Sequence, residues 1–120
     1  MEEALFRTML FDFYGELLTD KQKEYFDLHY NEDLSLAEIA ENYGISRQGV
    51  RDVIVRAEGV MQEIEDKTGL IRRFMQLREK AEIIESAARE IKTINYRQYG
   101  SGDLEQLSDR ILETAAQLKE

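Results

Sequence analysis

The sequence predicts an all-α protein, in which a helix-turn-helix domain is followed by a long helical hairpin or coiled-coil segment. Two kinds of pattern predict this class. Apolar residues recur at helical spacing along most of the 120 residues, and the chain contains no proline to interrupt a helix. Glycines and capping residues punctuate this spacing, as where Ser35 precedes Glu38 by three residues and Gly44 follows the last apolar position.

The first 30 residues predict two core helices. An apolar band rich in aromatic residues at helical spacing runs over residues 5–18. Thr19 and Gln22 repeat the capping-box pattern and start a second helix, which the polar residues 31–33 end. His29 is the only histidine, and we expect it to be structural or on the surface, because a metal site needs three or four donors.

The stretch LSLAEIAENYGISRQGVRDVIVRA, residues 34–57, predicts the helix-turn-helix itself. One helix starts at Ser35 and stops at Gly44, where a left-handed residue is favoured. Ser46 offers a second N-cap, and the helix that follows extends to about Lys67. The second helix of such a pair presents its first turn to the partner. We therefore expect the exposed binding residues to be Ser46, Arg47, Gln48 and Arg51.

The C-terminal region predicts two further helices with a heptad pattern, joined by a flexible turn at residues 99–102, with Ser101 or Asp103 as the cap. The predicted apolar seam consists of Leu70, Phe74, Leu77, Ala81, Ile84, Ala88 and Ile91, and then of Leu104, Leu107, Ile111, Ala115 and Leu118. These helices can close as a hairpin or pair with a second chain. Because an exposed apolar seam seeks a partner, we favour a homodimer. The expected domains are residues 1–67 and 68–120.

Charge is distributed unevenly along the chain, whose formal net charge is -9. Residues 1–66 carry six basic and sixteen acidic groups, whereas residues 67–97 carry eight Lys or Arg against four Glu. A nucleic-acid interface needs concentrated positive charge. The basic stretch, with Arg72 and Arg73 near its start, is therefore expected to assist the helix-turn-helix, provided that folding brings the two together.

Several function classes are excluded by the residues. With no Cys, one His, no Gly-rich phosphate loop and no nucleophile elbow, the chain offers no chemistry for an enzyme, a metal site or a cofactor. No apolar run approaches the roughly 20 residues that a membrane span requires, and no signal peptide is evident. We expect a cytoplasmic binding protein.

Residues 12–58, DFYGELLTDKQKEYFDLHYNEDLSLAEIAENYGISRQGVRDVIVRAE, resemble the YlxM family of small bacterial helix-turn-helix proteins. The helix-turn-helix itself resembles region four of the sigma factors, whose matching helix enters the major groove. The resemblance implies a DNA-binding or regulatory component of the signal recognition particle pathway, because genes of this family commonly neighbour that of the particle's GTPase. Gly49 and Asp52 depart from the sigma pattern: one removes a side chain, and the other adds a carboxylate near the expected interface.

Two hypotheses follow. The first is a regulatory protein that binds DNA or the particle's RNA through Arg47, Gln48 and Arg51, with help from the basic stretch. The second is an acidic adaptor that keeps the helix-turn-helix as a scaffold, binds the particle's GTPase and ignores DNA. The sequence contains no RNA-reading motif and does not separate DNA from RNA.

Overall fold

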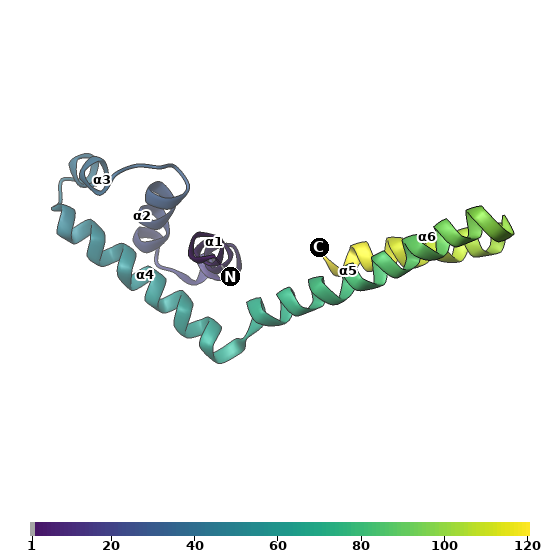
Figure 1. Cartoon of the computed structure of the whole chain (residues 1–120). Helices are drawn as coiled ribbons and strands as arrows, with labels where there is room; N and C mark the ends of the chain where they lie inside the picture. Colours follow the sequence, from purple (N-terminus) through teal and green to yellow (C-terminus); the bar gives the residue numbers. More distant parts are fainter. Residues whose placement is uncertain (1) are drawn as a thin grey trace. The chain divides into compact units, whose positions relative to one another are not determined.

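The computed structural model describes residues 2–120, and the ordered elements within that range are all helical, which confirms the all-α prediction (Figure 1). The helices are α1 (Glu3–Tyr14), α2 (Asp20–Tyr30), α3 (Leu36–Tyr43), α4 (Arg47–Thr68), α5 (Leu70–Ile94) and α6 (Gly102–Leu118), with a 3₁₀ turn η1 (Gly15–Leu17) and a π-helical turn η2 (Asn95–Tyr99). The chain divides into two compact units, residues 1–71 and residues 72–120.

In the first unit, α1, α2 and α3 all pack against α4 (Figure 1). The fully buried side chains come from all four helices and include Leu10, Phe26, Ile39, Val50 and Met61. Phe26 stacks on Phe11, with ring centroids 5.0 Å apart. The buried apolar residues of α4, from Val50 to Met61, recur at steps of three and four. They form one stripe along this helix, as the helical spacing of the sequence predicts.

The predicted helix starts are confirmed. Thr19 with Gln22, and Ser35 with Glu38, form complete capping boxes in which each side chain bonds to the other residue's backbone N–H. In the loop between α2 and α3, the Nδ1 of His29 lies 2.8 Å from the carbonyl oxygen of Leu34. The single histidine therefore has the structural role expected of it.

A buried hydrogen-bond cluster fixes the end of α4 within the first unit. The Tyr14 hydroxyl donates to Oε1 of Glu65 at 2.6 Å and lies 2.8 Å from the hydroxyl of Thr68. The same Glu65 oxygen accepts the backbone N–H of Ile71 at 2.9 Å, just beyond Gly69, which adopts a left-handed conformation with φ of 64°. Burial, together with the bond to the Glu65 carboxylate, raises the pKa of Tyr14. This cluster explains why the first unit extends to Ile71, four residues past the predicted limit.

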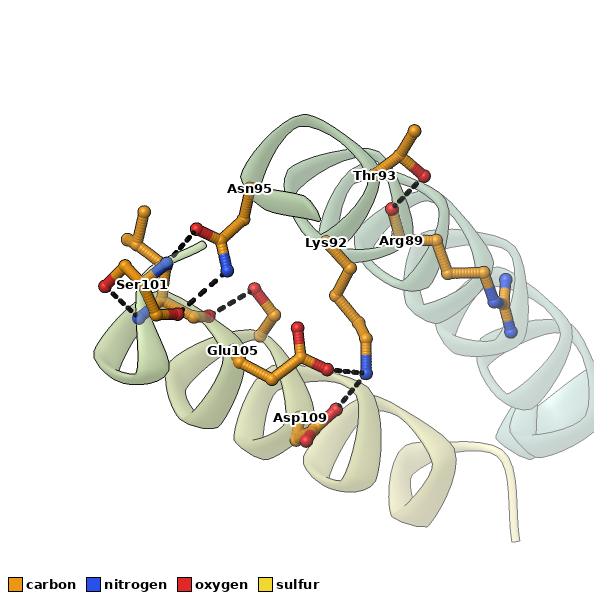
Figure 2. Close-up of polar contacts among 9 residues, drawn as sticks. Arg89, Lys92, Thr93, Asn95, Ser101, Glu105 and Asp109 are labelled. Atoms are coloured by element: carbon orange, nitrogen blue, oxygen red, sulfur yellow. Dashed lines mark hydrogen bonds and ion pairs between the residues drawn. The ribbon is translucent and has the colours of Figure 1, made fainter. Parts of the chain in front are cut away.

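The second unit is an antiparallel hairpin of α5 and α6. Arg78 Nη1 donates to the carbonyl oxygen of Lys119 at 2.8 Å, and at the other end the Asn95 side chain bonds to both the N–H and the C=O of Ser101 (Figure 2). Ser101 also caps α6, which decides between the two predicted caps. The predicted turn at residues 99–102 begins where the π-helical turn η2 ends, passes through Gly100 in a left-handed conformation and leads into α6.

The predicted apolar seam is used only in part to close the hairpin within one chain. Ala81, Ala88 and Ala115 are buried, but the hairpin leaves exposed the large aliphatic residues Leu77, Ile84, Ile91, Leu104, Leu107, Ile111 and Leu118. The physical reason is that α5 carries two heptad rows side by side, one of alanines and one of larger residues. Small residues let two helices approach closely, and in this hairpin the alanine row lies between them.

Candidate nucleic-acid interface

The turn between α3 and α4 is built from local sequence features. Gly44 ends α3 in a left-handed conformation, with φ of 67°, and the N–H of Ile45 bonds to the carbonyl oxygen of Ala40 at 3.1 Å. Ser46 then starts α4, because its hydroxyl accepts the N–H of Gly49 at 3.0 Å. These contacts set the direction in which the first turn of α4 leaves the domain.

The core beneath this turn holds the two helices together. Ile39 and Val50 are completely buried, and Ala40 and Ile54 are nearly so. Since each helix buries one face, the opposite face of the first two turns of α4 is left to solvent. Ser46, Arg47, Gln48 and Arg51 are all exposed there, so the structure places these four predicted residues together.

The two arginines form the positive part of this surface. Arg47 and Arg51 are four residues apart and therefore neighbours on one side of α4. Within residues 2–120, no ion pair or hydrogen bond engages either guanidinium group. Both groups can therefore reach a phosphate or a base edge without breaking an internal contact.

Gln48 lies beside the two arginines and, unlike them, has an internal hydrogen bond. Its amide Nε2 donates to Oδ1 of Asp52 at 2.8 Å, so the amide is oriented by a neighbour on the same helix. The carboxylate also adds negative charge beside the arginines. Spacing of four residues on a helix could have indicated this pair from the sequence.

Two further exposed residues of α4 were missed by the sequence analysis. Val55 is half exposed although it is aliphatic, because it falls outside the buried stripe. Arg56 is also exposed, but at about 100° per residue it points roughly 140° around the helix from Arg51. Counting positions from the buried stripe would have found both, and it places Arg56 away from the surface formed by Arg47 and Arg51.

The structure explains why a glycine occupies position 49, which the sequence alone did not reveal. A Cβ at this position would lie 3.2 Å from the Ser46 hydroxyl oxygen and 3.8 Å from the Ile45 side chain. The first of these contacts is tight, so a side chain would crowd the oxygen that caps α4. The absent side chain therefore protects the helix start beside the candidate interface.

Arg72 and Arg73 lie in the first turn of α5 and belong to the second unit, so a joint surface with Arg47 and Arg51 stays a prediction. Three of the eight cations in residues 67–97 have ion pairs. Lys67 pairs with Glu63, Arg89 with Glu85, and Lys92 with both Glu105 and Asp109. Residues 72–120 carry nine basic and nine acidic groups.

No cluster of three or more His, Cys, Asp or Glu side chains that could hold a metal occurs among residues 2–120. Over the same residues, no helix combines the length and the apolar character that crossing a bilayer demands.

Comparison with known proteins identifies the family. A family model described as "Putative helix-turn-helix protein, YlxM / p13 like" (UPF0122) matches residues 1–99. The chain belongs to the UPF0122 family. A UPF0122 protein of Thermoanaerobacter sp. (strain X514) is 41% identical over 114 residues, covering 78% of this chain and 97% of that protein. One from Acetivibrio thermocellus is 40% identical over 117 residues, covering 94% of this chain and 97% of that protein.

The UPF0122 match confirms the resemblance to the YlxM family and the helix-turn-helix. It spans the first unit together with α5 and η2, whereas α6 lies beyond it. A UPF0122 protein of Bacillus thuringiensis (strain Al Hakam) shares 47% identity over 76 residues, covering 63% of this chain and 69% of that protein.

Proposed function

We propose that this UPF0122 protein is a regulatory protein of the signal recognition particle pathway that binds nucleic acid through the start of α4. The observation that carries the proposal is the pair of exposed arginines, Arg47 and Arg51, which have no internal ion pair within residues 2–120 and stand on the second helix of a helix-turn-helix. That is where such folds read the major groove. The pathway rests on the YlxM resemblance alone.

Each member of the interface has a distinct role in this proposal. Arg47 and Arg51 contact phosphates or guanine edges, where one bidentate contact contributes about 1 to 3 kcal/mol of discrimination. Gln48 offers its amide to a base, with Asp52 holding its orientation. Ser46 fixes the helix start by accepting the N–H of Gly49, and it stands exposed where a phosphate can approach.

The test measures binding of the full chain to a nonspecific DNA duplex and to the particle's RNA at about 50 and 200 mM salt. We expect micromolar or tighter binding to nucleic acid that weakens by about tenfold at the higher salt. The double variant Arg47→Glu/Arg51→Glu should lose it, whereas Arg56→Glu, a charge reversal on another side of the same helix, should keep it. Unchanged binding by the double variant would refute the assignment of these residues.

A second candidate function is an adaptor that binds the particle's GTPase and ignores DNA. The observation that favours it is charge, because residues 1–71 carry seven basic against sixteen acidic groups. An acidic domain of this kind suits a basic protein partner better than a phosphate polymer. Binding to the RNA-free GTPase that falls with salt and survives nuclease, without binding to either nucleic acid, would support the adaptor and contradict the first proposal.

A further inference from the structure

The contact between α5 and α6 is made by small and polar side chains. The buried residues on the facing sides are Ala81, Glu85, Ala88, Asn95, Ser108 and Ala115. Towards the tip, Lys92 reaches across to Glu105, at 2.8 Å, and to Asp109 (Figure 2). Within residues 72–120, the fully buried part of this contact therefore contains no large aliphatic residue.

Those large residues gather on one outer side of the hairpin, here called the aliphatic face. It consists of Leu77, Ile84 and Ile91 from α5 and of Leu104, Leu107, Ile111 and Leu118 from α6. A groove of about 480 Å³, lined by residues of both helices that include Ile84, Ile111 and Leu118, shows that the two rows belong to the same surface. Each of these side chains is between 37% and 50% exposed.

This face is larger than a solvated hairpin of its size can easily carry. Seven aliphatic side chains exposed to this extent amount to on the order of 500 Å² of apolar surface, the size of the largest patch on a typical whole monomer. The second unit has only 49 residues, and its buried interior is mostly alanine and polar groups. Units this small usually need additional burial to be stable.

The spacing of the face selects a helical occupant. Leu77, Ile84 and Ile91 are seven residues apart, as are Leu104, Ile111 and Leu118. Residues repeated every seven positions act as knobs for the holes of another helix layer. Two such layers, placed face to face, make a four-helix bundle.

Charge and size favour a second copy of the same chain as that layer. The second unit has nine basic and nine acidic groups, so two copies do not repel through net charge, and no single sign calls for an oppositely charged partner. The groove and the exposed aliphatic rows lie on the same face, so this face can pair with the same face of a second copy in a two-fold contact. A two-helix layer of 17 residues has a footprint of on the order of 500 Å², so two partners together bury about 1,000 Å², the lower limit for a specific interface.

We propose that the aliphatic face of α5 and α6 is a homodimer interface, on which a second copy places the same face to complete a four-helix bundle. The interface is separate from the residues proposed to bind nucleic acid, so it stands or fails independently of the proposed function. Burial of the face in the dimer also supplies the stabilisation that the alanine-rich hairpin lacks on its own.

The test is the mass of the full chain in solution, without nucleic acid, by sedimentation equilibrium over a wide range of concentrations. We expect a dimer that dissociates on dilution. Ile84→Glu should weaken dimerisation at least about a hundredfold, because a two-fold interface contains the change twice. The matched control is Ile83→Glu: Ile83 is the neighbouring residue, is 69% exposed and lies outside the face, so this variant should remain dimeric.

Circular dichroism checks that each variant stays helical, and the milder Ile111→Ala replaces Ile84→Glu if the latter unfolds the hairpin. A melting temperature that rises with the concentration of the wild-type chain would also support the dimer. A wild-type chain that stays monomeric at about 100 μM would overturn the proposal. So would a dimer that Ile83→Glu and Ile84→Glu affect to the same extent.

Discussion

Two tyrosine hydroxyls in the first unit bond to glutamates, and they differ mainly in burial. Tyr14 is almost completely buried and bonds to Glu65, whereas Tyr43 is 40% exposed and donates to Glu24 at 2.5 Å. A hydrogen bond to a buried carboxylate contributes more than one in contact with water, because removing the donor leaves the acceptor poorly solvated. At this scale the environment of a bond decides its contribution to stability.

We therefore expect Tyr14→Phe to lower the free energy of unfolding by about 1.5 to 3 kcal/mol. Tyr43→Phe, which keeps the ring packed on Tyr25, should change it by less than about 0.5 kcal/mol. Urea unfolding followed by circular dichroism measures both. Equal effects of the two substitutions would contradict the expected dependence on burial.

At the scale of single elements, the helix ends were predictable and the face that closes the hairpin was not. Ser35, Gly44 and Ser46 act within one turn of themselves, so their residue types sufficed to place the helix-turn-helix and its exposed arginines. The buried side of α5 depends on α6, which lies far along the chain. Two heptad rows, containing Ala81 and Ile84, were equally periodic, and only packing distinguishes them.

Two glycines of the helix-turn-helix should respond in opposite ways to alanine. Nothing lies within 4 Å of a Cβ built at either Gly44 or Gly59, but Gly44 has a φ of 67°. Gly44→Ala should therefore cost about 1 kcal/mol of stability through backbone strain alone. Gly59→Ala, inside α4, should add about 0.5 to 1 kcal/mol. Thermal unfolding of the two variants checks the signs, and stabilisation by both would contradict the left-handed turn.

The hairpin should become less stable in acid because of Glu85. The hydrogen bond from Lys119, with further help from Arg89, lowers the pKa of this carboxyl below its ordinary value of 4.5. A lowered folded-state pKa means that the stabilisation is complete above about pH 4.5 and is lost as the pH falls through the folded-state pKa. By contrast, the raised pKa of Lys92 predicts a contribution that is lost only in strong base.

Thermal unfolding at pH 7 and in acid below the folded-state pKa of Glu85 tests this prediction. Glu85→Gln should destabilise the chain at pH 7, and its difference from wild type should shrink in acid, where the wild-type carboxyl is itself protonated. Glu82→Gln changes an exposed carboxyl on the same helix and serves as the control. A difference for Glu85→Gln that is the same at both pH values would mean that packing, and not ionisation, explains its effect.

At the scale of the whole molecule, the two units divide the charge unequally. Seven basic and sixteen acidic groups place the entire net charge of -9 in residues 1–71, whereas residues 72–120 are neutral. The unit with the candidate nucleic-acid interface is therefore also the one that repels a phosphate polymer at long range. Binding to nucleic acid must then depend on a few local arginines.

This dependence predicts a shallow salt dependence for nucleic-acid binding. Since each neutralised duplex phosphate contributes about -0.9 to the slope of log K against log salt concentration, Arg47 and Arg51 together give about -2 for each helix-turn-helix. Arg51→Gln should reduce the magnitude of that slope by about 1. Arg97→Gln, which changes an exposed arginine in η2, should leave the slope unchanged. Fluorescence anisotropy titrations at several salt concentrations give the slopes, and a wild-type slope several times steeper would mean that further cations, including those of the second unit, contact the nucleic acid.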